Sequence, residues 1–363
     1  MTEFFRGTDK GFIGLALIVG CASDPAMTAG DGAVIDAPVA NDRPATSDAG
    51  AMAVSGAHAL RAGSFETVVV TGDNAFFRWR NTARAAMGRP IDDQPIAEVA
   101  VAELGHVWRT PGGALRSAWV PGETSVPAVR ERIPAGVEQV VAGRSVFCAR
   151  LASGEVQCWD RSRGFPTPPI AGIANVAWIT TDNERTIWMA LRDGTVQRFE
   201  WLATAPRPMA VAGLTGVARL AVGMGHVCAL TAAGAARCYG MNNLGQLGDG
   251  STTARAMPTD AAEVLTDVLD LGAGSQHTCA RLRDRTVRCW GSNVAGQIGV
   301  GAGMQSVNTP TAVPGINDAT ALAVGGGHTC VLRANDEVWC WGGGPAVTMP
   351  ALATPARVTL SRM

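Results

Sequence analysis

The chain has 363 residues, enough for one large domain or two ordinary ones. Charged residues make up only 17% of it and the formal net charge is −1, which argues against a nucleic-acid-binding protein with a stripe of basic side chains. Lys10 is the only lysine, so a phosphate-loop or Schiff-base lysine is excluded beyond the first ten residues.

A short apolar run lies near the N-terminus, at residues 11–20. It is too short to span a bilayer and has the length of a signal-peptide core. It ends in Ile18-Val19-Gly20-Cys21, which resembles the bacterial lipobox, although the acidic residues before it weaken the usual positive charge. The resemblance implies that residues 1–20 are a lipoprotein signal peptide and that Cys21 is lipidated. The alternatives are an ordinary signal peptide and a buried apolar segment.

The next segment, residues 21–55, is rich in Ala, Asp, Gly, Pro, Ser and Thr and has almost no large apolar side chains. Such a composition buries too little surface to offset its ordering entropy, so we expect a flexible linker between the lipid and the folded domain. Ala22 stands where Asp retains some lipoproteins at the inner membrane. We therefore expect an exported protein in the periplasm or at the cell surface, with the outer membrane favoured.

Aromatic residues recur at one place in a repeated pattern that fills the rest of the chain. Steps of 40 residues and then two of 51 separate Trp79, Trp119, Trp159, Phe199, Tyr239, Trp290 and Trp341. Each copy predicts three short strands, with a turn of Gly, Asp and Asn before the third, and then a Pro-containing fourth strand such as 208–211 or 310–313. Four strands in 40–51 residues are typical of a propeller blade. We expect residues 56–363 to form an all-β, seven-bladed β-propeller; an open solenoid or a sandwich is the alternative.

Two copies carry the most specific motif. Residues 239–248 read Tyr-Gly-Met-Asn-Asn-Leu-Gly-Gln-Leu-Gly, and residues 290–299 read Trp-Gly-Ser-Asn-Val-Ala-Gly-Gln-Ile-Gly. With the Gly-x-x-His upstream, they resemble repeats of the regulator of chromosome condensation (RCC1) family. The first four copies match by frame and scattered residues only. The resemblance implies a seven-bladed propeller but no single activity, because family members act as nucleotide-exchange factors, inhibitors and scaffolds.

Eight of the nine cysteines form four pairs with a constant spacing of 10: Cys148/Cys158, Cys228/Cys238, Cys279/Cys289 and Cys330/Cys340. Residues flanking a tight turn face each other across an antiparallel pair, near disulfide reach. The other three copies lack both cysteines and have Val68/Arg78, Trp108/Ala118 and Trp188/Arg198 in these positions. Because the cysteines come and go in pairs, we expect four disulfides, which an exported location permits.

A metal site is the competing interpretation of these cysteines. His226 shares a strand face with Cys228 and Cys238, and two thiolates with an imidazole suit zinc or copper. However, the Cys148 pair has Val146 in place of the histidine, and His106 has no cysteines. The histidine also belongs to the RCC1 repeat without any cysteine. We therefore expect a structural histidine, no metal and no cofactor.

The sequence contains no His-Glu-x-x-His and no Gly-x-Ser-x-Gly motif, so we expect no enzyme. The longer steps place extra residues in 241–255 and 292–308, which we expect on one side of the ring as a binding face. The candidate contact residues are Asn242, Asn243, Gln246, Asp249, Asn293, Gln297 and Asn308.

The expected function is that of a monomeric envelope lipoprotein that binds a protein or a surface polymer through these loops, with no nucleic acid and with membrane contact only through the lipid. The first alternative is a polysaccharide hydrolase or lyase. It requires carboxylates on the strands around the propeller axis, where the repeats show mostly Gly, Ala and Val. The second is a guanine-nucleotide exchange factor, which an exported location separates from its substrate.

Overall fold

The computed structural model describes the propeller region with gaps, over residues 57–62, 66–71, 75–80, 89–90, 96–102, 105–119, 136–143, 146–160, 173–182, 186–201, 207–257, 262–302, 304–343 and 352–358. The ordered elements of these residues are all β-strands. No helix in the described part of the chain is long and apolar enough to cross a membrane. Residues 1–56, which include Cys21 and the expected signal peptide and linker, lie outside the described residues.

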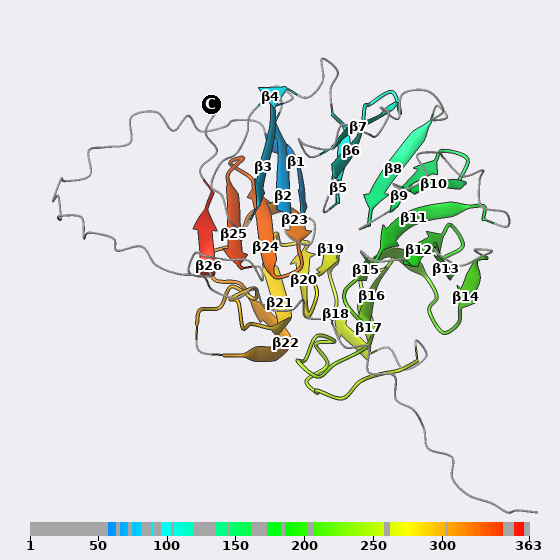
Figure 1. Ribbon diagram of the computed structural model, residues 1–363. Helices are drawn as coiled ribbons and strands as arrows, with labels where there is room; N and C mark the ends of the chain where they lie inside the picture. Colours follow the sequence, from blue (N-terminus) through cyan, green and yellow to red (C-terminus); the bar gives the residue numbers. More distant parts are fainter. Residues whose placement is uncertain are drawn as a thin grey trace, which may run out of the picture. The chain divides into compact units, whose positions relative to one another are not determined.

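The strands of the described residues form seven antiparallel sheets, which follow one another along the chain (Figure 1). Sheets one to three contain β1 (Ala57–Ala62), β2 (Glu66–Thr71), β3 (Ala75–Arg80) and β4 (Arg89–Pro90); β5 (Glu98–Ala102), β6 (Gly105–Arg109) and β7 (Leu115–Trp119); and β8 (Val137–Ala142), β9 (Val146–Leu151) and β10 (Val156–Asp160). Sheets four and five contain β11 (Val176–Thr181), β12 (Thr186–Leu191), β13 (Val196–Glu200) and β14 (Met209–Val211); and β15 (Val217–Val222), β16 (His226–Thr231), β17 (Ala236–Gly240) and β18 (Ala262–Leu265). Sheets six and seven contain β19 (Val268–Ala273), β20 (His277–Leu282), β21 (Val287–Ser292) and β22 (Ser306–Ala312); and β23 (Ala319–Val324), β24 (His328–Arg333), β25 (Val338–Gly342) and β26 (Leu352–Arg357).

The sheets close into a ring through their first strands. Each first strand contacts the first strand of the next sheet, from β1 and β5 through to β19 and β23. The contact between β23 and β1 then joins the last sheet to the first. The first strands are therefore the inner strands of a closed, seven-bladed β-propeller, as the repeat predicts. Closure leaves few unpaired strand edges.

The turn between the second and third strands of a sheet is tight and local. In sheet four it contains Gly194, whose φ is +80° and whose Cβ, if present, would lie 2.8 Å from the Cα of Gly216. The equivalent residues of sheets six and seven, Arg285 and Asp336, adopt positive φ without being glycine. These turns set the hairpin register that places each cysteine opposite its partner.

Sheet two departs from the expected register. The repeat frame places Trp108 opposite Ala118, but Trp108 pairs with Arg116. The turn of this hairpin, with Gly113 at a φ of +78°, has the same length and hydrogen bonds as the turn of sheet three. The register is displaced by one residue, so that Val107 and Ser117 are the partners ten residues apart. The Trp108/Ala118 assignment is therefore wrong.

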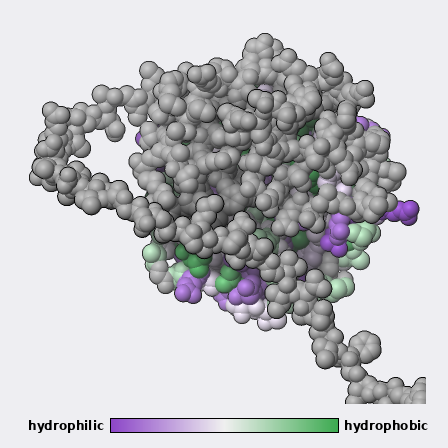
Figure 2. Space-filling model, viewed as in Figure 1, coloured by the Kyte–Doolittle hydropathy of each residue, from purple (hydrophilic) through white to green (hydrophobic). Residues whose placement is uncertain are grey.

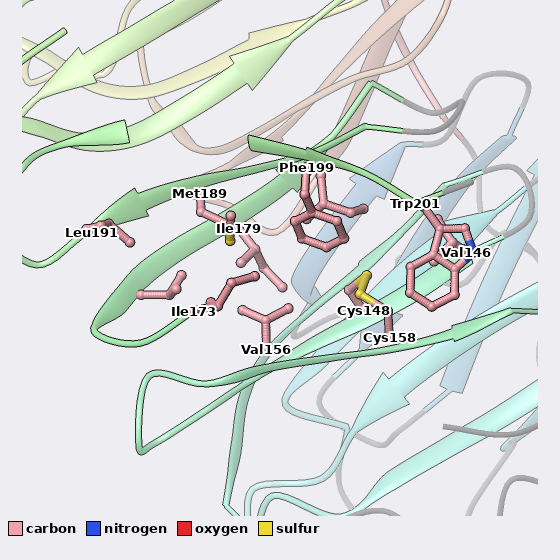
Figure 3. Packing of buried hydrophobic residues seen from close by; sticks show 12 residues of the cluster. Val146, Cys148, Val156, Cys158, Ile173, Ile179, Met189, Leu191, Phe199 and Trp201 are labelled. Carbon is pink, nitrogen blue, oxygen red and sulfur yellow. A yellow bond between two sulfur atoms is a disulfide. The ribbon is translucent and has the colours of Figure 1, made fainter. Parts of the chain in front are cut away.

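The hydrophobic core lies in layers between neighbouring sheets. Between sheets three and four, Val146 and the Cys148–Cys158 disulfide pack against Ile179, Met189 and Phe199 (Figure 3). A similar layer joins the two ends of the ring, where Leu60 and Val69 of sheet one pack against Leu332 of sheet seven. Alternation along each strand explains this arrangement, because successive side chains face opposite neighbouring sheets.

Candidate functional site

Four disulfides lie at the centres of the second and third strands of sheets three, five, six and seven, in the pairs that the spacing predicts. The bonded residues are direct cross-strand partners, for example Cys228 and Cys238, with Cα atoms 4.1 Å apart. All eight side chains are buried. The cysteines are thus structural staples within single sheets.

Cys340 departs from the complete burial of the other seven bonded cysteines. It pairs with Cys330 across β24 and β25, with Cα atoms 4.1 Å apart, as the spacing predicts. However, 8% of Cys340 is exposed, whereas Cys330 is fully buried. On its other side Cys340 faces Ala356 of β26, and the register of that pairing shifts between Cys340 and Gly342. Sheet six has the same shift between Cys289 and Gly291, yet Cys289 is fully buried, so the shift alone does not account for the exposure of Cys340.

The histidines that precede three of these disulfides bind threonines of the next sheet. Nε2 lies 2.9 Å from Oγ1 in the pair His226–Thr278 and 3.0 Å in the pair His277–Thr329. The third pair, His328–Thr67, is 2.7 Å apart and joins sheet seven to sheet one. The histidines therefore hold neighbouring sheets together.

The second hydrogen bond of the threonine shows which ring nitrogen carries the proton, and burial determines the charge of the ring. Thr278 donates to the carbonyl of Gln246 at 3.0 Å, so its oxygen accepts from the Nε2–H of His226. Burial lowers the pKa of His226 and His328 to about 4 and that of His277 to about 3, so all three rings are neutral at pH 7.

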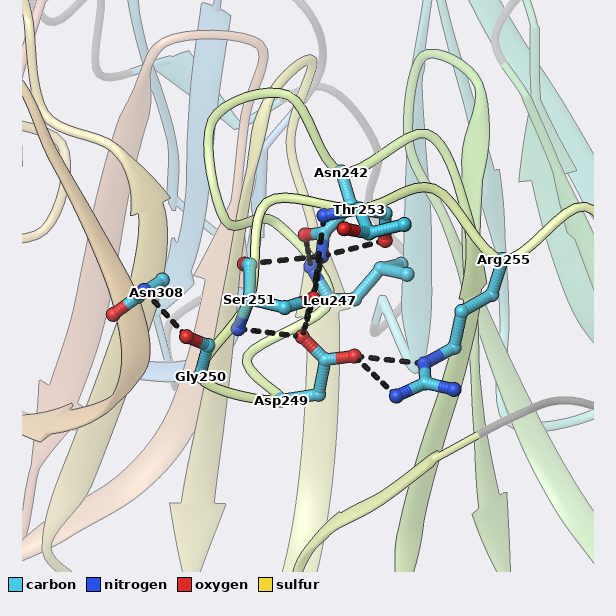
Figure 4. A network of polar contacts seen from close by, with 8 residues as sticks. All are labelled: Asn242, Leu247, Asp249, Gly250, Ser251, Thr253, Arg255 and Asn308. Atoms are coloured by element: carbon cyan, nitrogen blue, oxygen red, sulfur yellow. Dashed lines mark hydrogen bonds and ion pairs between the residues drawn. The ribbon is translucent and has the colours of Figure 1, made fainter.

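The loop after β17 folds around the side chain of Asn242 (Figure 4). Its Oδ1 accepts from the backbone N–H of Leu247, and its Nδ2 donates to the carbonyls of Ser251 and Thr253. The carboxylate of Asp249 accepts from Ser251 and pairs with Arg255 at 2.7 Å. Asn242 is only 1% exposed, so its amide replaces backbone pairing inside the loop.

The loop after β21 repeats this arrangement. The Oδ1 of Asn293 accepts from the N–H of Ile298, and its Nδ2 donates to the carbonyls of Gly301 and Met304. Gln297 accepts from the N–H of Ala295, just as Gln246 accepts from that of Leu244. Both loops are thus built on the same two amide side chains.

Each loop is also fastened to the following sheet. The carbonyl of Gln246 accepts from Nε1 of Trp290, and that of Gln297 accepts from Nε1 of Trp341. Asn308 of β22 forms two 2.8 Å hydrogen bonds with Gly250, one through its carbonyl and one through its side-chain amide. The loops are therefore braced structures on a rigid ring.

The structure divides the seven candidate contact residues into two groups. Asn242, Gln246, Asn293 and Gln297 are buried and hold the loops together, whereas Asn243 is exposed and Asp249 and Asn308 are partly exposed. Sequence reasoning selected the first four because they belong to the repeat motif. Only Asn243, Asp249 and Asn308, together with the loop backbone, have polar atoms accessible at the surface. Binding through these loops stays a prediction.

Exposed apolar side chains gather at the end of the ring that carries these loops, which we call the loop end. First strands finish, second strands begin and third strands finish at this end, as the pairing of His226 with Gly240 shows. Large exposed hydrophobic residues here include Met224, Met241, Val294 and Met304. Figure 2 shows hydrophobic and hydrophilic residues side by side on the described surface along the lower edge, where Figure 1 places β17, β18 and β22. Sequence reasoning missed these methionines, because Met241 stands at a variable position of the motif at 239–248, and Met224 and Met304 lie outside both quoted motifs.

The inner strands contain mostly Gly, Ala and Val, as the repeats predict, but they also carry polar side chains. Glu98 lies on β5 and Asp270 on β19. Gln139 on β8 exchanges two 2.9 Å hydrogen bonds with the backbone of Ile179 on β11. Polar side chains at the inner strands thus reach backbone groups of the next sheet.

Comparison with known proteins agrees with this architecture. A model of the regulator of chromosome condensation (RCC1) repeat matches residues 268–297 and 319–344. The chain is 26% identical over 238 residues to the ultraviolet-B receptor UVR8 of Arabidopsis thaliana, covering 57% of this chain and 53% of the receptor. It is 28% identical over 137 residues to protein pim1 of Schizosaccharomyces pombe, covering 36% of this chain and 25% of pim1. The chain thus spans about half the length of the first of these relatives and less of the second.

Solved structures share the fold at low identity. Yeast RCC1 (Prp20) in its complex with Kap60 has a TM-score of 0.55 at 18% identity, with 83% of this chain and 74% of that chain covered. Human WBSCR16 has a TM-score of 0.60 at 15% identity, with 79% and 84% covered. The chain thus carries RCC1 repeats at the matched residues, within a closed ring of seven sheets that has the fold of these solved structures.

Proposed function

We propose that the protein is a non-enzymatic envelope lipoprotein whose propeller binds a protein or a surface polymer through the loop end. The observation that carries this proposal is the presence of exposed apolar side chains on loops that are already braced. Met224, Met241, Val294 and Met304 stand exposed next to loops whose backbone is fastened to the following sheet. Methionine is enriched at protein interfaces, and a preordered surface loses little entropy on binding.

The charge of the loops agrees with a neutral, largely apolar contact. Residues 241–255 and 292–308 contain two charged side chains, Asp249 and Arg255, and these pair with each other. Relatives with this fold include proteins that bind other proteins: yeast RCC1 was solved bound to Kap60, and binding of Prp20p to Gsp1p and histones is described. These likenesses support a protein partner ahead of a polymer.

A capture experiment with the full-length tagged protein tests the binding surface. The double variant Met241→Glu/Met304→Glu places two charges on the loop end, and Met209→Glu places a charge on an exposed methionine of sheet four as the matched control. Material captured from detergent-solubilised envelopes is identified as protein by mass spectrometry or as polymer by sugar analysis. We expect the double variant to lose the partner at least about tenfold and the control to retain it.

The proposal fails if the double variant captures the same material as the wild type, or if Met209→Glu loses it equally. A screen on cell-wall and envelope polysaccharides accompanies the capture. Turnover that is abolished by Glu98→Gln or Asp270→Asn would replace the binding function with the enzymatic alternative.

The lipid anchor is tested separately. Cys21→Ser removes the thiol that lipidation requires, so we expect the protein to move from the membrane fraction to the periplasmic fraction while its propeller stays folded. Metabolic labelling with a fatty acid should label the wild type and not the variant. Equal membrane association of both forms would contradict anchoring through Cys21.

A further inference from the structure

Charged side chains from several sheets converge on the inner strands of the ring. Arg61 lies on β1, Glu98 on β5, Arg219 on β15 and Asp270 on β19, and all four of these strands are inner strands. Trp178, on the inner strand β11, lies beside Arg219. We call these five residues the inner-ring cluster. Four different sheets thus each contribute one of these charged side chains to the strands around the axis.

Arg219 is held from two sides. Its guanidinium carbon lies 4.9 Å from the ring centre of Trp178 in sheet four, and its Nη1 lies 3.7 Å from Oδ1 of Asp270 in sheet six. Stacking on the indole fixes the plane of the guanidinium. The distance to Asp270 is longer than an N–H···O hydrogen bond, and 45% of the Arg219 side chain is exposed. Arg219 therefore presents an oriented fork of donors that its ion pair does not saturate.

A second arginine, Arg61, contacts Glu98 and also acts on Asp270. Nη2 of Arg61 lies 3.6 Å from Oε1 of Glu98, again beyond hydrogen-bond distance, and the side chain of Arg61 is 45% exposed. The positive charges of Arg219, Arg281 and Arg61 all act on Asp270. Arg281 is the cross-strand partner of Asp270 on β20. Arginines from sheets one, five and six thus all contribute positive electrostatic potential at one carboxyl group.

Positive charge exceeds negative charge in this region. Nε of Arg109 lies 3.7 Å from Glu98. Four arginines therefore interact with two carboxyl groups, and the formal sum is 4 − 2 = +2; the arginines are Arg61, Arg109, Arg219 and Arg281, and the carboxyl groups are those of Glu98 and Asp270. Glu138, on the neighbouring β8, does not change this excess because it pairs with Arg150 at 2.6 Å. Burial raises the pKa of both Glu98 and Asp270, which favours their uncharged forms and leaves the arginines less compensated.

We propose that the inner-ring cluster is a binding site for a carboxylate, with Arg219 as its bidentate donor, Arg61 as a second cation and the face of Trp178 against the carbon chain of the ligand. A guanidinium fork matches the geometry of a carboxylate. A phosphate dianion fits less well, because it places two charges on one group beside Glu98 and Asp270, whereas each carboxylate group carries only one. The carboxylate belongs either to a free small molecule or to the end of a peptide.

This site is separate from the loop end. Asp270 and Arg219 are the third residues of their strands and lie near the strand starts, whereas the loop end is where the first strands finish. Arg61 is the fifth of the six residues of β1, and its side chain reaches Glu98 at the start of β5. Variants of Met241 and Met304 therefore leave the inner-ring cluster unchanged. The inference does not rest on the function proposed above.

Titration calorimetry on the whole protein at low salt tests the site with three probes. The probes are succinate, a tetraalanine peptide with a free C-terminal carboxylate, and the same peptide with an amidated C-terminus. We expect saturable binding of succinate, of the free-acid peptide, or of both, and no binding of the amide. Binding of succinate assigns the site to small carboxylates, and binding of the peptide acid alone assigns it to a chain terminus.

Variants separate a ligand site from a structural ion pair. Arg219→Ala should weaken binding at least about tenfold, Arg219→Lys should weaken it less, and Arg283→Ala, an exposed arginine of the β20–β21 turn, should leave it unchanged. Asp270→Asn should strengthen binding several-fold, because it removes the carboxylate that competes for Arg219; a purely structural pair predicts no gain. Melting curves confirm that each variant is folded. Absence of binding by all three probes, or equal affinities in Arg219→Ala and Arg283→Ala, would overturn the proposal.

Discussion

His277 is buried without an acidic partner, and its ring is kept neutral by the protein around it. In the described structure the ring forms one hydrogen bond, from Nε2 to Thr329 of the next sheet at 3.0 Å, and its Nδ1 has none. The ring also lies against Gly274, where an added Cβ would be 2.3 Å from its Cε1. Glycine at this position therefore makes room for the histidine that reaches across to the neighbouring blade.

The lowered pKa of the three buried histidines predicts loss of stability in acid. The unfolded chain takes up protons near pH 6.5, whereas the folded rings resist them until about pH 4 for His226 and His328 and about pH 3 for His277. Stability is therefore fully present above pH 6.5 and falls as the pH drops toward these values, by about 1.4 kcal/mol for each unit of pKa depression per histidine. The raised pKa values of Glu98 and Asp270 act in the opposite sense.

Urea unfolding of His277→Asn and wild type at several pH values between 7 and 4.5 isolates the contribution of one ring. We expect the variant to be less stable at pH 7, with a stability that depends less on pH by up to about one proton, so that the two curves converge in acid. Parallel curves would show that His277 is not the group that titrates.

The two long loops show how an element without strands becomes rigid. In the loop after β17, the buried amide of Asn242 satisfies backbone groups on both sides of the turn, and Gly250 is fastened to Asn308 of the next sheet. Leu247, with its side chain fully buried, anchors the same loop in the layer between sheets five and six. The loop is thus part of the contact between blades.

Truncation of one amide should unfold this loop locally. In Asn242→Ala, the buried N–H of Leu247 loses its partner at a cost of about 1–3 kcal/mol, and the less buried carbonyls of Ser251 and Thr253 lose theirs as well. We expect faster hydrogen exchange over 241–255 while the strands of sheet five keep their protection. Asn243→Ala, which changes the exposed neighbour, is the matched control and should exchange like the wild type. Equal effects of the two substitutions would contradict the structural role of Asn242.

The whole molecule depends on closure between its first and last sheets. Leu60 and Val69 pack against sheet seven, and Oγ1 of Thr67 shares a 2.7 Å hydrogen bond with Nε2 of His328. The contact from His277 to Thr329 has the same chemistry but joins sheets that follow each other in the chain. Only the first of these contacts joins sheets at the two ends of the propeller domain.

Thr67→Val and Thr329→Val therefore compare ring closure with an ordinary contact between blades. Each substitution leaves one buried histidine without its partner, and we expect a loss of about 1–3 kcal/mol in both. Hydrogen exchange should distinguish them: Thr67→Val should expose amides in sheets one and seven together, and Thr329→Val those in sheets six and seven. An identical exchange pattern in the two variants would argue against a separate closure contact.

Features that are local in the chain were predictable from the sequence. The repeated aromatic position counts the blades, and a spacing of 10 across a tight turn brings cysteines such as Cys279 and Cys289 opposite each other. The same reasoning failed for Trp108, because the turn of sheet two lies one residue earlier relative to Trp119 than the aromatic frame predicts. It also assigned Asn242 and Gln246 to a partner when the loop itself uses them. A motif shows that a residue is required but not which way its side chain points.

The sequence by itself determined the all-β class, the seven copies and the pairing of the cysteines, because a hairpin's register depends on residues close together in the chain. Only the tertiary structure decided that Arg61, Glu98, Arg219 and Asp270 lie around one axis, and that Met241 and Met304 stand exposed at one end. The reason is that these residues belong to different blades. Closure of the ring brings them together, and no short-range pattern in the chain encodes that closure.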